Sequence, residues 1–308
     1  HPTVVPVGIG QAVWSDIHKR IVAVIGEGGE QVSNIPHVTM NDDRSIPQIG
    51  LGVWQVPDDV ATDACLTAFE AGYRHIDTAA LYGNEEGVGR AIRASGLSRD
   101  ELFITTKVWN TDHGRARTTD AMQASLDRLG LEYVDLYLIH WPTPDRGLYV
   151  ETWETVLELK EQGRTLSAGV SNFHPAHLRT IIDATGATPT INQVELHPWL
   201  PQREVRAADD EHAVVTEAWS PLASGGLIDN AVLADIGSKH GKSTAQVMIR
   251  WHLQIGNVVL PKSVTAERIV SNVDVFDFEL DADDLIAIEG LEDPSRRTGP
   301  NPDAFNEA

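Results

Sequence analysis

The chain is poor in cysteine, with one Cys among 308 residues. A single thiol cannot form an internal disulfide, so we expect a reducing, cytoplasmic compartment. Cys65 falls in a helical pattern at 60–72. A lone Cys in such a position is more often a small buried apolar side chain than a nucleophile, so the sequence does not favour thiol chemistry.

Basic residues are also scarce, with 24 Lys and Arg against 45 Asp and Glu and a formal net charge of -21. Nucleic acids and anionic membranes bind basic surfaces, so this composition excludes both as partners. If the protein binds an anionic ligand, its few cationic side chains must be gathered in one place.

Long hydrophobic runs are missing as well. No apolar segment approaches the roughly 18 to 20 residues that a membrane-spanning helix needs. Residues 1–33 mix apolar and charged residues and lack the features of a signal peptide. We interpret 1–33 as an appended leader of uncertain structure, with a packed strand at "RIVAVIG" as the alternative. We expect 34–308 to form a single domain.

A regular alternation of short β-rich runs and helical patterns follows from about Ile35 onwards. Residues 37–50 suggest a β-hairpin around the turn-rich "NDDR". The helical patterns end on glycines, a common helix stop. Eight β-rich runs follow the hairpin, at 51–54, 74–79, 102–109, 134–141, 166–173, 190–196, 213–220 and 257–263.

This alternation predicts parallel β-structure with crossover helices, either a closed (β/α)8 barrel or an open doubly wound sheet. The count of eight favours the barrel. So does the lack of a G-x-G-x-x-G turn after the first run, since "GVGRAIRASG" lies inside a helical pattern. The polar, turn-rich end at 292–308 predicts a tail lying over the barrel.

Polar side chains stand where successive apolar runs end. Asp77, Lys107 and His140 close the second, third and fourth runs, and Tyr82 lies in the loop after the second. In such a barrel these ends share one rim, where active sites form. Each residue alone has a structural explanation, such as a helix cap or a core hydrogen bond. A barrel has no structural need for all four together, because buried charges are costly unless they pair.

The four residues suit a proton transfer to a carbonyl. A Lys ammonium beside a phenol lowers the pKa of that phenol, and an Asp fixes the Lys. Tyr82 would then be the general acid and His140 would orient the substrate. No metal-ligand cluster is evident, and a hydride must come from a cofactor. A Schiff-base role for Lys107, as in an aldolase, leaves Tyr82 unexplained.

The remaining rim residues suit that cofactor. Ser171, Asn172 and Gln193 offer hydrogen bonds to a carboxamide, and Trp219 offers a flat face for a nicotinamide ring. Residues 260–272 supply the local basic cluster that so acidic a protein needs for phosphate. That cluster consists of Lys262 and Arg268, with Ser263 beside them.

These motifs resemble the aldo-keto reductase superfamily, and most closely its bacterial branch that includes the 2,5-diketo-D-gluconate reductases. The matching stretches are "GYRHIDTAALYGNEEGVGRAI", "FITTKVWN", "DLYLIHWP", "GVSNF", "NQVELHP" and "LPKS" with the following R-x-x-x-N. The resemblance covers nearly all of the chain after the leader. It implies a (β/α)8 barrel and NADPH-dependent reduction of aldehydes and ketones without a metal.

The resemblance also implies individual roles. Tyr82 would be the proton donor, Lys107 the group that depresses its pKa, Asp77 the partner of Lys107, and His140 the substrate-orienting residue. Trp54, Trp109 and Asn110 would line the substrate pocket. The implied cofactor contacts are Ser171, Asn172, Gln193, Trp219, Ser220, Pro221, Leu222, Lys262, Ser263, Val264, Arg268 and Asn272.

Two positions depart from the family pattern. Trp219 stands where many members carry Tyr, which keeps the flat face, and Ser271 stands where many carry Glu, which we expect to loosen adenine binding. The expected partner is a small-molecule carbonyl substrate, and nothing demands more than a monomer. The alternative function is a cofactor-binding barrel with a structural or partner role and no significant turnover.

Overall fold

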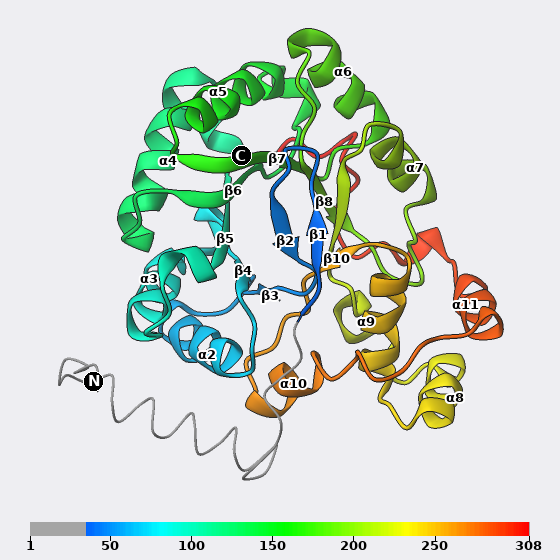
Figure 1. The fold of residues 1–308 in the computed structure, drawn as a ribbon. Helices are drawn as coiled ribbons and strands as arrows, with labels where there is room; N and C mark the ends of the chain where they lie inside the picture. The colour runs from blue at the N-terminus through cyan, green and yellow to red at the C-terminus, as the bar shows by residue number, and fades with distance from the viewer. Residues whose placement is uncertain (1–34, 308) are drawn as a thin grey trace.

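The computed structural model describes residues 35–307, so the leader at 1–33 and its possible strand lie outside the described residues. Within 35–307, eight parallel strands form one sheet surrounded by helices (Figure 1). All eight β-rich runs are confirmed as strands. They are β3 (Leu51–Gly52), β4 (His75–Asp77), β5 (Phe103–Val108), β6 (Val134–Ile139), β7 (Thr165–Ser171), β8 (Ile191–Glu195), β9 (Val215–Trp219) and β10 (Val258–Val259).

The first and last strands meet, which closes the sheet into a barrel. Neighbouring strands pair in chain order from β3 to β10. Ile49 forms a parallel bridge with Val259, and the amide of Gly50 donates to the carbonyl of Val259 at 3.0 Å. The barrel is therefore correct and the open-sheet alternative is wrong.

Helices form the outer layer and follow the strands in sequence. The helical patterns of the sequence lie at 60–72, 84–96, 118–130, 149–163 and 243–256, and they correspond to α2, α3, α4, α5 and α9. Ser243 caps α9 by accepting from the amide of Gln246. The full set is α2 (Asp58–Glu70), α3 (Glu85–Ala94), α4 (Arg115–Leu129), α5 (Tyr149–Glu161), α6 (Pro175–Thr185), α7 (Arg203–Glu211), α8 (Ala231–His240), α9 (Thr244–Gln254), α10 (Ala266–Ser271) and α11 (Ala282–Glu289).

The glycines inside α3 have a packing role. A Cβ on Gly87 would lie 2.1 Å from the carbonyl oxygen of Asp58, at the start of α2. A Cβ on Gly89 would lie 2.3 Å from the carbonyl oxygen of Leu129, at the end of α4. These glycines therefore lie inside a helix, as predicted, and let α3 approach both neighbouring helices closely.

The predicted hairpin covers the N-terminal end of the barrel. Strands β1 (His37–Thr39) and β2 (Ser45–Pro47) pair antiparallel. Met40 and Ile46 are buried in one apolar cluster with Phe103, Ile191 and Val258, which are the first residues of their strands. The hairpin thus seals this end and leaves the opposite end for a ligand.

The C-terminal segment lies at that opposite end, as predicted, and is drawn in red in Figure 1. The Glu195 carboxylate, at the end of β8, accepts from the backbone amides of Thr298 and Gly299. Phe305 packs on Trp141, which follows β6, with ring centroids 4.6 Å apart. The tail therefore spans the rim formed by the C-terminal ends of the strands.

Candidate active site

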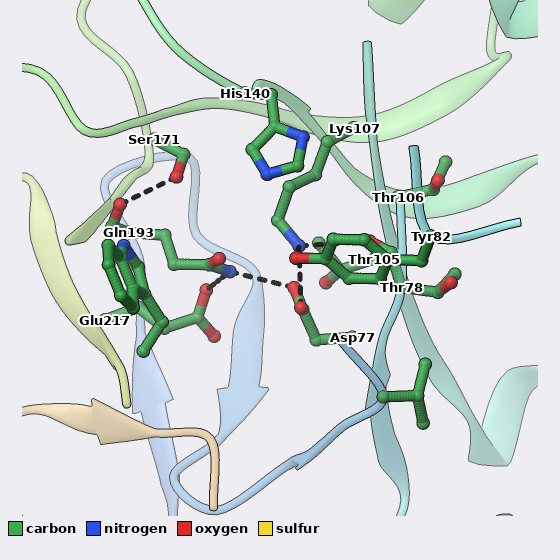
Figure 2. A network of polar contacts seen from close by, with 12 residues as sticks. Asp77, Thr78, Tyr82, Thr105, Thr106, Lys107, His140, Ser171, Gln193 and Glu217 are labelled. Carbon is green, nitrogen blue, oxygen red and sulfur yellow. Dashed lines mark hydrogen bonds and ion pairs between the residues drawn. The ribbon is translucent and has the colours of Figure 1, made fainter. Parts of the chain in front are cut away.

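Lys107 stands at the centre of a buried polar network inside the barrel (Figure 2). Its Nζ donates to Asp77 Oδ1 at 2.6 Å, to the carbonyl of Thr78 at 3.0 Å and to Tyr82 Oη at 3.2 Å. The Lys107 side chain is fully buried. A buried ammonium is tolerated here because every one of its three donors has an acceptor.

Adjacent elements bring these groups together. Strands β4 and β5 pair in register, so that Asp77 lies opposite Thr105, two residues before Lys107. Tyr82 closes the short 3-10 helix η1 (Ala80–Tyr82), which ends on Gly83 with φ 65°. The following Asn84 accepts from Thr78 Oγ1 and donates to two backbone carbonyls. The loop that carries Tyr82 is therefore fixed at both ends.

The network keeps Lys107 protonated. Burial acts to lower the pKa of the Lys107 amine, but attraction to Asp77 and Tyr82 and hydrogen bonds to both outweigh it, so the pKa is raised. Burial also raises the pKa of the Asp77 carboxyl, whereas Lys107 and Gln193 act to lower it. A Schiff base requires a neutral amine, so this arrangement disfavours the aldolase alternative.

The state of Tyr82 differs from the expectation of a depressed pKa. Burial raises the pKa of the Tyr82 phenol above its usual value, while the nearby Lys107 ammonium offsets only part of this rise. The phenol therefore holds its proton at neutral pH, which is the form that a general acid requires. The contribution of Lys107 is to stabilise the phenolate at the moment the proton leaves.

His140 lies immediately after β6, and its ring lies beside Tyr82 at the rim of the barrel. Its ring makes edge contacts with Tyr82 and Trp109, with centroids 5.7 Å and 5.1 Å away. Burial, and then the charge of Lys107, hold the pKa of His140 well below its usual value. The imidazole is thus neutral, so it has one N–H to donate and one nitrogen that accepts.

The residues expected to hold a carboxamide form a connected group. Ser171 Oγ donates to the carbonyl of Gln193, and Asn172 Nδ2 donates to Ser171 Oγ and to the carbonyl of His140. Trp219 Nε1 donates to Asn172 Oδ1 at 2.8 Å. These four residues therefore line one side of the barrel, next to the Lys107 network.

The remaining cofactor candidates follow β9 and β10. Ser220, Pro221 and Leu222 continue directly from Trp219, with Ser220 at φ 48°. Lys262 and Arg268 are exposed, and the described residues include no acidic side chain in an ion pair with either of them. Ser263 and Asn272 are buried, whereas Val264 is exposed. The basic cluster is thus free for an anion.

The three residues expected to line the substrate pocket differ in their exposure and in their contacts. Trp54 is 47% exposed, and Trp109 contacts His140, so both can line an opening at the rim. Asn110 is fully buried, and its Nδ2 donates to the carbonyl of Glu307 in the tail. Asn110 therefore contacts the C-terminal segment through its Nδ2, while its buried Oδ1 has no hydrogen-bond partner among the described residues.

Two acidic residues were absent from the predicted site. Glu217, in the middle of β9, accepts from Gln193 inside the barrel, and Glu195 anchors the tail. A charged residue within the otherwise apolar run "AVVTEAWS", two positions before Trp219 and so on the same strand face, is the signal that identifies Glu217.

Comparison with known proteins decides the family. A profile described as Aldo/keto reductase family matches residues 48–293. The chain belongs to the aldo/keto reductase family. An aldo-keto reductase of Mycobacterium sp. (strain KMS) is 54% identical over 271 residues, covering 88% of this chain and 98% of the relative.

Two further relatives of this aldo/keto reductase are informative. Methylglyoxal reductase DkgA of Escherichia coli (strain K12) is 50% identical over 276 residues, covering 89% of this chain and 99% of DkgA. A mutant of Gox0644, solved in complex with NADPH, is 45% identical with a TM-score of 0.85, covering 89% of this chain and 99% of Gox0644.

No group of three or more His, Cys, Asp or Glu side chains within 35–307 is arranged to hold a metal ion. Across the same residues, no helix is both long and apolar enough to cross a membrane. Cys65 is buried in α2, where burial raises the pKa of its thiol to about 12.

Proposed function

We propose that this protein reduces small aldehydes and ketones to alcohols with NADPH. The observation that carries the proposal is the contact of one buried ammonium, Lys107 Nζ, with both the Asp77 carboxylate and the Tyr82 phenol. When bound, NADPH supplies the hydride. The relatives named reductases and the NADPH-bound relative support the same reaction class.

The chain's own part is proton delivery. Tyr82 donates its phenolic proton to the carbonyl oxygen of the substrate as general acid. The phenolate that remains lies 3.2 Å from Lys107 Nζ, so its charge is neutralised within the protein. Asp77 holds the ammonium in place and balances its charge before the proton moves.

We assign the orientation of the substrate to side chains at the rim of the barrel. His140 donates its single N–H to the carbonyl oxygen, which places that oxygen beside Tyr82 Oη. The indoles of Trp54 and Trp109 provide apolar walls. The expected substrates are small carbonyl compounds, of which methylglyoxal and sugar ketoacids are representatives.

We assign the polar side chains of the rim to NADPH. Lys262 and Arg268 would bind the 2′-phosphate, supported by Ser263, Val264 and Asn272. Trp219 would offer its flat face to the nicotinamide, and Ser220, Pro221 and Leu222 would contact the cofactor next to it. Ser171, Asn172 and Gln193 contact the carboxamide. These roles, like a single domain over 34–308, a monomeric state and a cytoplasmic location, are part of the proposal.

A turnover assay separates this proposal from a barrel that only binds the cofactor. Purified protein is given NADPH with a panel of a simple aldehyde, methylglyoxal, a sugar ketoacid and a bulky ketone, and NADPH absorbance is followed. We expect multiple turnovers with at least one small carbonyl. NADPH binding without consumption across the whole panel would favour the non-catalytic alternative.

A further inference from the structure

Glu217 is a buried acid to which the reaction above gives no task. It lies in the centre of β9, and its side chain is fully buried within the barrel. Its Oε2 accepts from Gln193 Nε2 at 2.7 Å, while its Oε1 makes no hydrogen bond with the described residues. The cost of burying a carboxyl makes a purely incidental placement unfavourable.

Gln193 Nε2 is held between two carboxyl groups. It donates to Asp77 Oδ2 at 2.8 Å and to Glu217 Oε2 at 2.7 Å (Figure 2). A primary amide nitrogen has two hydrogens, so both are used. Turning the amide over would place Gln193 Oε1 against the oxygens of Asp77 and Glu217, where no hydrogen is available from Asp77. The pair of acids therefore fixes which end of the amide faces away from them.

The opposite end of the amide remains available. No donor within 35–307 reaches Gln193 Oε1. The neighbouring donors are already engaged, since Ser171 Oγ donates to the backbone of Gln193 and Asn172 Nδ2 donates to Ser171 and His140. This part of the rim thus offers an acceptor, and a ligand that binds here must bring an N–H of its own.

We propose that Glu217 is a positioning residue for the cofactor: together with Asp77 it orients Gln193 so that Oε1 accepts from the carboxamide NH2 of the nicotinamide. The inference rests on the proposed function, because it takes NADPH as the ligand at Gln193. It assigns Glu217 no contact with cofactor or substrate.

The environment of Glu217 favours the protonated form of its carboxyl. Burial, and then the charge of Asp77, raise the pKa of Glu217 to about 8. The groups that face it are Gln193 from β8, His75 and Asp77 from β4, and Lys107 from β5. His75 Nε2 lies 3.8 Å from Oε1. At neutral pH the carboxyl is largely protonated, yet Oε2 still accepts from Gln193.

The test is a double perturbation measured by binding. Dissociation constants for NADP+ and for its 3-acetylpyridine analogue, which keeps the carbonyl but lacks the NH2, are determined by quenching of tryptophan fluorescence. Wild type should bind the analogue about tenfold more weakly, the effect of one hydrogen bond. The Glu217→Met variant removes the acceptor for Gln193. In this variant, the dissociation constant of the analogue divided by that of NADP+ should fall to about two or below. Glu217→Gln, which keeps an acceptor oxygen, should restore the wild-type ratio.

The outcomes are distinguishable. Glu217→Asp, in which the carboxyl is one methylene too short to reach Gln193, should also lose discrimination and serves if the Met variant does not fold. Equal discrimination in wild type, Met and Asp variants would overturn the role of Glu217 while leaving NADPH binding intact. Wild type that binds NADP+ but does not discriminate would overturn the contact at Gln193 itself. Wild type that binds neither nucleotide would overturn the proposed function.

Discussion

Replacing Lys107 by Met tests the buried network through both stability and rate. The ammonium is fully buried and contacts Asp77 Oδ1 at 2.6 Å. Removing one member of a buried ion pair typically costs about 3–5 kcal/mol, because the other charge is left uncompensated. The phenolate of Tyr82 also loses a charge-assisted hydrogen bond, which is worth about 1.5–3 kcal/mol. That corresponds to a roughly ten- to hundred-fold fall in kcat.

The stability loss should depend on pH in a defined direction. Without Lys107, the folded-state pKa of Asp77 rises further above its unfolded value, so the folded variant binds an extra proton at low pH. The Lys107→Met variant is therefore less destabilised at pH 5.5 than at pH 8.5. Urea unfolding at both pH values, with tryptophan fluorescence as the signal, measures the difference.

Lys160→Met provides the matched control. Lys160 Nζ lies 3.0 Å from Asp42 Oδ2, but the Lys160 side chain is 34% exposed. We expect a loss of about 1 kcal/mol or less and an unchanged kcat. The reasoning is refuted if Lys107→Met keeps a wild-type kcat, or if its destabilisation is equal at the two pH values.

Three further results are expected. Lys262→Ala and Arg268→Ala should each raise KM for NADPH about tenfold and leave KM for NADH unchanged, because each loses a contact to the 2′-phosphate; equal effects on both cofactors would contradict this. Glu217 has a folded-state pKa of about 8 against 4.5 in the unfolded reference, so wild-type stability falls between these pH values, and Glu217→Gln should flatten that fall in urea titrations. Glu195→Gln should expose the C-terminal tail to limited proteolysis, since one of the amides of Thr298 and Gly299 loses its acceptor, whereas unchanged cleavage would mean that the tail is held by other contacts.

The fold was predictable from the alternation of strands and helices and from the fact that parallel strands end at the same rim. Eight short apolar runs separated by helical patterns require parallel pairing, and all eight became strands. The rim location of Asp77, Lys107 and His140 follows from the same topology, since parallel strands share the end at which they finish. Helices α6, α7, α8, α10 and α11 were not assigned from the sequence; α7 is short and most of its residues are charged, so it offers few apolar residues from which to recognise a helix.

The details of the site depended on packing that the sequence does not contain. Tyr82 has a raised pKa because burial outweighs the nearby cation, and burial depends on the closed barrel rather than on spacing. Asn110 lies near the third strand end as expected, but the distant Glu307 occupies its amide. Glu217 gains its position only when β8 and β9 bring it beside Gln193.

The central claim is that Tyr82 supplies the proton while Lys107 stabilises the phenolate left behind. The most direct measurement is the single-turnover rate of NADPH oxidation by Tyr82→Phe with a small aldehyde, together with its NADPH dissociation constant. We expect an unchanged dissociation constant and a rate lower by about 10² to 10⁴. A Phe variant that binds NADPH normally and reduces the aldehyde at close to the wild-type rate would contradict it.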